Sequence, residues 1–203
     1  MIGILLSDNS YEQDIRELLM AFYPGETFAH EKQDDVTYYI EGTYSEDVEQ
    51  GTFTLKIIDN GEVQAEKTFP LDYKNRLEAK TEIKRELYEL LSERTGKKLP
   101  WGTLTGIRPT KIALTRLDAG WKEDDIKDFM RETYLTSEEK IDLSVEIAAR
   151  EKELLSQIDY ENGYSLYVGI PFCPTTCLYC SFTSYPIGLW KGKTYLYLEA
   201  LFK

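Results

Sequence analysis

The chain has 203 residues, 42% of them hydrophobic, and a formal net charge of −12. A chain of this length and composition can bury a core in one domain or two small ones, which excludes a disordered or fibrous protein. The acidic balance disfavours nucleic-acid and anionic-membrane partners, because phosphate groups are neutralised by clustered Lys and Arg. No apolar run approaches the ~20 residues that span a bilayer, and "MIGILLSDNS" lacks the basic region of a signal peptide. We therefore expect a cytoplasmic protein without a membrane span.

Charge and aromatic residues are unevenly distributed along the chain. Residues 164–203 contain three lysines and one acidic residue, a local charge of +2, whereas residues 1–163 carry −14. Ten of the 26 aromatic residues also lie in the last 40 positions. This shift predicts a domain boundary near Asn162-Gly163, which gives an N-terminal accessory domain of residues 1–162 and a second domain of residues 163–203.

The first 70 residues predict a strand, a helix and a three-stranded meander. "GILL" at residues 3–6 is typical of a short buried strand, and the S-x-x-Q pattern at residues 10–13 predicts a capping box that opens a helix ending before Pro24. Alternating residues predict strands around positions 36–41 and 53–57, and Asn60-Gly61 is typical of a tight hairpin into "EVQAEKTF". The predicted helix buries one apolar stripe: Ile15, Leu18, Leu19 and Phe22.

Helices dominate the following 85 residues or so. We expect Asp72 to cap a long helix that ends at Gly96, and a second capping box, at residues 136–139, to open a later helix. The fold class predicted for residues 1–162 is therefore α+β, with a small antiparallel sheet and several helices. The apolar stripes of the three helices are Ile83, Leu87, Leu90 and Leu91; Ile126, Phe129, Met130 and Tyr134; and Ile141, Val145, Ala148 and Leu155.

The loop "LPWGTLTGIRPTKIAL", residues 99–114, allows two readings. Backbone N–H groups, the positive end of a helix dipole and the cations Arg108 and Lys111 are suited to a phosphate or carboxylate. The loop is not a Walker A motif, because G-x-x-x-x-G-K-[ST] is absent. A helix with Pro109 at its first position, packed by Trp101, is the favoured reading, since helix caps are far commoner than anion sites.

All three cysteines, Cys173, Cys177 and Cys180, lie in "VGIPFCPTTCLYCSF". An odd number of cysteines so close together excludes a disulfide framework. Structural zinc takes four protein ligands, and the only histidine, His30, falls in the other predicted domain. Three thiolates would also leave a catalytic zinc weakly Lewis-acidic, and a nucleophilic cysteine would need a histidine partner.

An iron–sulfur cubane accounts for this number of thiols, because three thiolates hold three irons and the fourth stays open for a substrate or cofactor. The preceding "YSLYVGI", residues 164–170, alternates like a strand that ends at Pro171. In a β/α barrel the loop after a strand's C-terminal end belongs to the active site. There Gly169 would leave room for a cofactor, and Tyr179 offers a ring on which an adenine can pack.

C-x3-C-x2-C with an aromatic residue before the last cysteine resembles the radical S-adenosylmethionine superfamily. "YVGIPFC" with "CLYCSF" is similar to the oxygen-independent coproporphyrinogen III oxidase family, and "GTLTGIRPTK" after an acidic α/β region resembles its HemZ-type coproporphyrinogen dehydrogenase branch. The resemblance implies that the second domain begins with the first strand and cluster loop of a radical S-adenosylmethionine β/α barrel.

The resemblance also implies a cofactor set and a reaction. Cys173, Cys177 and Cys180 would ligate a 4Fe-4S cluster whose fourth iron is chelated by S-adenosylmethionine, and Tyr167 and Tyr179 match positions that contact that cofactor. An electron from a donor protein would cleave the sulfonium, and the 5′-deoxyadenosyl radical would start the decarboxylation of two coproporphyrinogen III propionates to vinyl groups, giving protoporphyrinogen IX. The cofactors supply this chemistry and the protein positions them.

Two positions depart from the family pattern. Many members have histidine where Gly169 stands, and well-studied oxidases have a further cysteine where this chain has Phe182. Relatives that share this second departure resemble haem chaperones, so a haem-binding protein without decarboxylase activity is the alternative. Only 40 residues remain from Tyr164, whereas a barrel takes about 200. We therefore expect an N-terminal fragment of a longer enzyme, inactive by itself.

Overall fold

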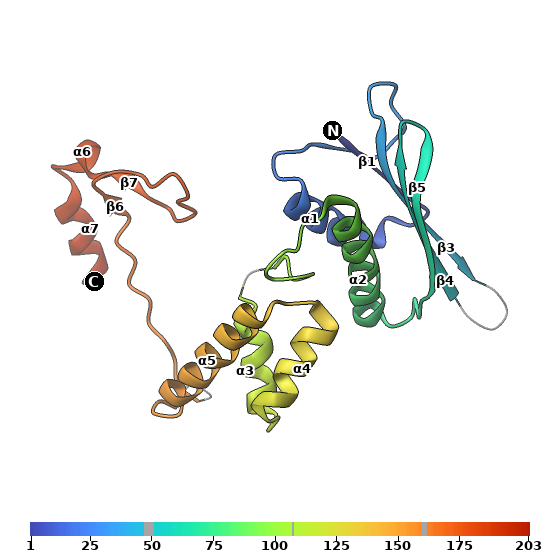
Figure 1. Cartoon of the computed structure of the whole chain (residues 1–203). Helices are drawn as coiled ribbons and strands as arrows, with labels where there is room; N and C mark the ends of the chain where they lie inside the picture. The colour runs from blue at the N-terminus through green and yellow to red at the C-terminus, as the bar shows by residue number, and fades with distance from the viewer. Residues whose placement is uncertain (47–50, 107, 160–161) are drawn as a thin grey trace. The chain divides into compact units, whose positions relative to one another are not determined.

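A computed structural model describes the chain except for residues 47–50, 107 and 160–161 (Figure 1). It divides into two compact units, Met1–Gln157 and Ile158–Lys203, which are described separately below. The division falls five residues before the boundary suggested by composition, and the extent of the two functional domains stays a prediction. Within the described residues, no helix is long and apolar enough to cross a membrane.

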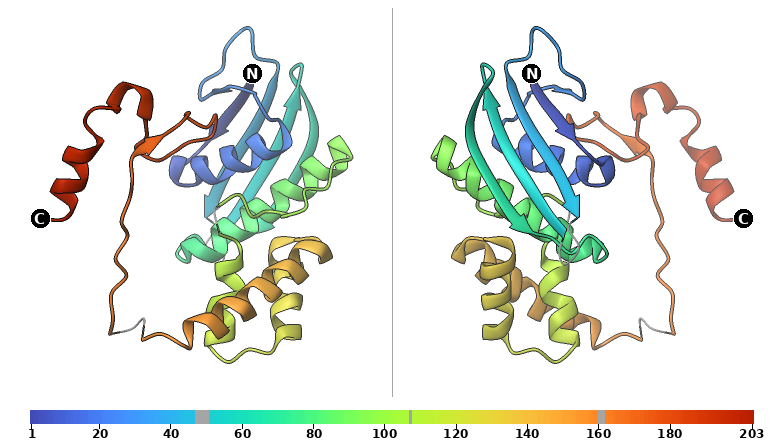
Figure 2. Two further views of the ribbon diagram at one scale, coloured as in Figure 1. Left: turned by 90° about the vertical axis from the view of Figure 1, so that its left-hand side faces the viewer. Right: turned by 90° about the vertical axis from the view of Figure 1, so that its right-hand side faces the viewer.

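The first unit contains a five-stranded mixed sheet in the order β2-β1-β3-β4-β5 (Figures 1 and 2). Strands β3, β4 and β5 are antiparallel, as the predicted meander requires, and Asn60 and Gly61 join the last two with φ angles of 52° and 81°. The sheet extends beyond the expected antiparallel strands, because β1 is parallel to both β2 and β3. The helix after β1 carries the chain back, so the next strands run in the same direction. The strands are β1 (Ile2–Leu6), β2 (Phe28–Ala29), β3 (Tyr38–Glu46), β4 (Gly51–Asp59) and β5 (Glu62–Pro70).

Helices α1 (Glu12–Phe22) and α2 (Arg76–Thr95) pack with the inward side chains of the sheet into the larger core. The predicted stripes of both helices are confirmed, since every member is less than 10% exposed. Burying such side chains typically stabilises a fold by about 1.5–3 kcal/mol each. On the opposite face of the sheet, Ala29, Val36 and Tyr39 form a smaller cluster with Leu5 and Ile58.

The starts of these two helices differ from the prediction, whereas the end of α2 does not. Asp8, rather than Ser10, caps the first helical turn, a 3-10 turn at Asn9–Tyr11, by accepting from the Ser10 N–H at 2.9 Å. Asn75 caps α2 by accepting from the Glu78 N–H, while the Asp72 carboxylate accepts from the Lys74 N–H in the preceding turn. The sequence pattern indicates that a polar residue caps each helix, but several polar residues lie near each helix start, so the pattern does not identify which one is the cap. Gly96 ends α2 with a φ of 68°, as predicted.

Helices α3 (Thr110–Asp118), α4 (Glu123–Tyr134) and α5 (Glu138–Leu155) form a second core within the first unit. The capping box predicted for α5 is wrong: Ser137 is the N-cap, without a side-chain bond, and the buried Thr136 hydroxyl has no partner among the described residues. Pro109 immediately precedes α3 instead of occupying its first turn. Six residues are buried in this core: Ala113, Ile126, Met130, Ile141, Val145 and Ala148.

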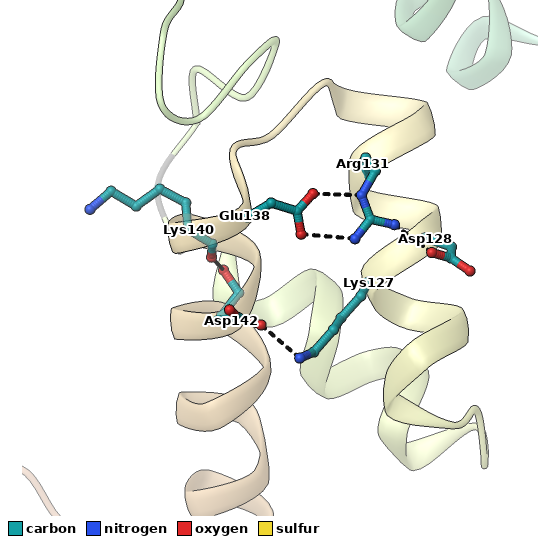
Figure 3. Close-up of polar contacts among 7 residues, drawn as sticks. Lys127, Asp128, Arg131, Glu138, Lys140 and Asp142 are labelled. Atoms are coloured by element: carbon teal, nitrogen blue, oxygen red, sulfur yellow. Dashed lines mark hydrogen bonds and ion pairs between the residues drawn. The ribbon is translucent and has the colours of Figure 1, made fainter.

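Charged side chains also join α4 to α5 (Figure 3). Arg131 donates from Nε to Glu138 Oε1 at 2.6 Å and from Nη2 to Glu138 Oε2 at 2.8 Å, and it also pairs with Asp128. Lys127 donates to Asp142 at 2.6 Å. Hydrogen bonds from Arg131 lower the pKa of Glu138. These pairs are exposed to solvent, so they orient the helices more than they stabilise them.

The second unit contains short elements: β6 (Phe172–Cys173), β7 (Tyr185–Pro186), α6 (Ile187–Trp190) and α7 (Thr194–Leu201). Strand β6 is parallel to β7 over two residue pairs. The strand expected at residues 164–170 is wrong, because this segment is irregular in the structure. A strand requires a hydrogen-bonded neighbour, and the ladder here begins only at Phe172.

Candidate functional site

Aromatic side chains hold the ends of the cysteine loop together. The Phe172 ring packs edge-on against Tyr197 of α7, with centroids 5.4 Å apart, and also approaches Trp190. The Tyr185 N–H donates to the Pro171 carbonyl at 2.7 Å, which brings the two sides of the loop together before β6 and β7 pair. The Tyr197 hydroxyl donates to the Gly169 carbonyl. The loop of residues 173–184 is therefore closed at its base by contacts between its two flanks and α7.

The three cysteines of the loop line one cavity of about 640 Å³. All are free thiols; Cys177 is exposed, and Cys173 and Cys180 are partly buried. The Cys180 N–H donates to the Cys177 carbonyl at 3.0 Å, a tight turn that the C-x-x-C spacing permits. The Cys180 thiol lies 3.6 Å from both the Phe182 carbonyl and the Ser184 hydroxyl.

Tyr167 and Tyr179, the residues expected to contact a cofactor, line the same cavity and are 83% and 88% exposed. Their rings are thus available to a ligand. A Cβ atom at Gly169 would come within 3.1 Å of the Tyr167 ring, so glycine leaves space here that a larger residue would fill. The structure adds Ser184 and Tyr197 to this cavity. No local motif marks either residue; Tyr197 reaches the loop only because α7 folds back on it.

The number and type of the donor atoms suit an iron–sulfur cluster, but the spacing between the three thiols does not. Three unpaired thiols share one accessible cavity, as a cluster with one open iron requires. Within the described part of the chain, however, no three Cys, His, Asp or Glu side chains lie close enough together to hold a metal ion. Binding a cluster therefore requires the loop to draw its thiols inward. His30 belongs to the first unit, where it lies 3.9 Å from Glu12.

Of the favoured reading of residues 99–114, the helix is present as α3, but Pro109 lies just before it. Trp101 is half-buried beneath the Lys140 ammonium, and the loop is bound to the end of α4, where Thr103 N–H donates to the Tyr134 carbonyl at 2.8 Å. Ile107 lies outside the described residues. The same loop also lines a cavity. Cations from α2 and from further along α3 line it together with Arg108 and Lys111 of the loop.

The resemblance to oxygen-independent coproporphyrinogen III oxidases rests on "YVGIPFC" and "CLYCSF" around the cysteine loop and on "GTLTGIRPTK" in the first unit. Comparison with curated proteins confirms that resemblance. The chain is 29% identical over 202 residues to the oxygen-independent coproporphyrinogen-III oxidase-like protein HemZ of Bacillus subtilis (strain 168). The match covers 97% of this chain and 40% of the length of that relative. No family model and no solved structure matches the chain.

Proposed function

We propose that this chain carries the cluster loop of a radical S-adenosylmethionine enzyme that oxidatively decarboxylates coproporphyrinogen III in haem biosynthesis. The observation that carries the proposal is the set of three free thiols on one cavity, within a chain similar to HemZ over nearly its whole length. A 4Fe-4S cluster with S-adenosylmethionine on its open iron would supply one-electron cleavage of the sulfonium and a carbon-centred radical.

Each residue of the cavity has a separate part in this proposal. Cys173, Cys177 and Cys180 would lose their protons and act as thiolate ligands. The exposed rings of Tyr167 and Tyr179 would cover the apolar parts of the cofactor and keep water away. A porphyrinogen with its propionates is the substrate and a separate protein the electron donor.

Cluster binding is tested by anaerobic reconstitution of the full-length gene product with iron and sulfide. We expect about four irons and four sulfides per chain, and an electron paramagnetic resonance signal of the reduced protein that changes when S-adenosylmethionine is added. Cys177→Ser should abolish the signal, whereas Ser184→Ala in the same cavity should keep it. Uptake of zinc without iron, or a signal indifferent to S-adenosylmethionine, would refute the proposal.

The reaction is tested separately with the full-length gene product. Anaerobic incubation with coproporphyrinogen III, a reductant and S-adenosylmethionine should yield 5′-deoxyadenosine and protoporphyrinogen IX, which is detected as protoporphyrin fluorescence after the quenched mixture is oxidised in air. Phe182 lines the cavity at the position where well-studied oxidases have a further cysteine, and this favours a haem carrier as the second candidate. Tight haem binding with neither product would identify the carrier.

A further inference from the structure

The first unit contains a cavity of about 450 Å³ with a concentration of positive charge. It lies between α1, α2, the loop before α3, and α3 itself. Of the sixteen described residues that line it, five are Lys or Arg and one is acidic, in a chain whose net charge is −12. Charge of one sign in a cleft concentrates ligands of the opposite sign. The five cations are Lys80, Lys84, Arg108, Lys111 and Arg116.

Lys84 of α2 is the most informative of these cations. It is 5% exposed, and its ammonium donates to the Thr105 hydroxyl at 2.7 Å, a neutral partner. Thr105 in turn donates to Glu17 at 2.9 Å. Burial and the neighbouring Lys80 lower the pKa of Lys84 to about 8. Keeping an ammonium in this position costs stability that an apolar side chain would not, which points to a ligand rather than to packing.

The other cations are only partly neutralised. Lys80 pairs with Asp14 at 2.5 Å, and Arg108 lies 3.9 Å from Glu151. Lys111 is exposed, and no carboxylate among the described residues pairs with it.

The Arg116 guanidinium stacks over Phe129 at 3.6 Å. It donates from Nη1 to the Ile112 carbonyl, while its buried Nε has no partner in the described structure. A buried donor of this kind favours an incoming acceptor.

The single acidic side chain, Glu17, reduces the positive charge without cancelling it. Burial works to raise the pKa of Glu17, but hydrogen bonds from Gln13 and Thr105, together with Lys84 and Lys80, lower it overall. Glu17 is therefore ionised at neutral pH. With Asp14 beside Lys80 and Glu151 near Arg108 also counted, positive charges still outnumber negative ones around the cavity. The N-terminus of α3 also opens onto the cavity through Pro109 and Lys111, and its dipole adds to the attraction for an anion.

We infer that this cavity binds a small organic anion through its phosphate or carboxylate oxygens, held by Lys84, Lys111 and Arg116. The volume lies in the range of small-molecule sites and exceeds what a lone inorganic ion needs. Leu77, Leu104 and Ile112 provide an apolar wall for the organic part of the ligand. The inference does not rest on the cysteine loop or its reaction, because all of the lining residues belong to the first unit.

Binding is measured on the whole chain by calorimetry and by amide chemical shifts, with three probes: inorganic phosphate, adenosine 5′-monophosphate and citrate. We expect saturable binding of one molecule per chain that shifts the amides of Thr103, Thr105 and Gly106. Tighter binding of adenosine 5′-monophosphate assigns a phosphate ester, and tighter binding of citrate assigns a carboxylate. Absence of saturable binding at about 10 mM of every probe would overturn the inference.

Two matched charge reversals distinguish binding at the cavity from non-specific electrostatic attraction of the anion to the protein. Lys111→Glu in the cavity should weaken binding about tenfold or more, while Lys98→Glu, at another exposed lysine that does not line the cavity, should leave the affinity nearly unchanged. Equal losses in both variants would show non-specific attraction and refute the site. Lys84→Met should abolish binding, and circular dichroism shows whether this variant is folded. If it is not folded, the comparison of Lys111→Glu with Lys98→Glu still tests the site.

Discussion

The two units of this chain use apolar side chains in opposite ways. In Met1–Gln157 the sheet and five helices bury three clusters of apolar side chains, with twelve large side chains less than 2% exposed. In Ile158–Lys203 no described residue is buried, although the segment is rich in aromatic residues, and Leu178 and Tyr179 next to the last cysteine are almost fully exposed. Apolar composition therefore does not by itself make a core. The first unit has layers to pack, whereas the described side chains of the second unit remain at its surface, some of them around the cavity that the three thiols line.

The largest expected effect comes from the same substitution made in both units. Leu87→Ala, at a fully buried position of α2, should lower the free energy of unfolding by about 2–5 kcal/mol, because it leaves a cavity in the core. Leu178→Ala, at a fully exposed position, should change it by less than about 0.5 kcal/mol. Chemical denaturation followed by circular dichroism measures both. A comparable loss at Leu178 would break the contrast between the units.

The second effect concerns Lys84, a buried charged side chain of the first unit. The folded-state pKa of Lys84 is about 8 against an ordinary value of 10.5, so the folded protein binds fewer protons than the unfolded one between these pH values. Stability from this group therefore rises with pH across that window, and its cost is fully present below pH 8.

The stability advantage of Lys84→Met over wild type should accordingly shrink by roughly 3 kcal/mol between pH 7 and pH 10.5, measured in buffer without phosphate or citrate. Subtracting the variant removes the titration of the tyrosines common to both proteins. A difference in unfolding free energy that stays constant with pH would show that Lys84 keeps its ordinary pKa.

A third comparison uses two glycines in the left-handed region of the first unit. A Cβ atom at Gly102, φ 56°, would overlap the Tyr134 carbonyl oxygen, whereas one at Gly120, φ 83°, would meet nothing within 4 Å. Gly120→Ala should cost about 1–2 kcal/mol from backbone strain alone, and Gly102→Ala about 1–3 kcal/mol more because it separates the loop from α4. Thermal unfolding measures both. Equal losses of stability in the two variants would mean that the loop around Gly102 is not packed against the end of α4.

The smallest effect is expected at the surface pairs between α4 and α5 shown in Figure 3. Glu138→Gln should lower the melting temperature slightly at low salt, and the difference should vanish at high salt. Because Arg131 lowers the pKa of Glu138, the contribution is present above the ordinary pKa of 4.5 and is lost as the pH falls through the lowered value. A double-mutant cycle with Arg131→Gln isolates the pair. A lower melting temperature that persists at high salt would show that the ion pair is shielded from solvent.

In the proposed site of the second unit, the residues that lie close together in the sequence could be predicted. Cys173, Cys177 and Cys180, with Tyr167 and Tyr179, were assigned from spacing and resemblance, and all five line one cavity. Tyr197 and Ser184 were missed, because they join the cavity through the fold of α7 and the closure of the loop. The expected barrel strand at residues 164–170 is irregular instead, since alternation of side chains does not supply a hydrogen-bonding neighbour.

In the first unit, the sequence by itself determined the apolar stripes of α1 and α2, the Asn60-Gly61 hairpin and the end of α2 at Gly96, because each depends on residues close together in one element or turn. The tertiary structure alone decided the parallel pairing of β1 and the cation-lined cavity. Lys84 and Lys111 are 27 positions apart and come from different helices, so no local pattern brings them together. Long-range packing sets such a juxtaposition.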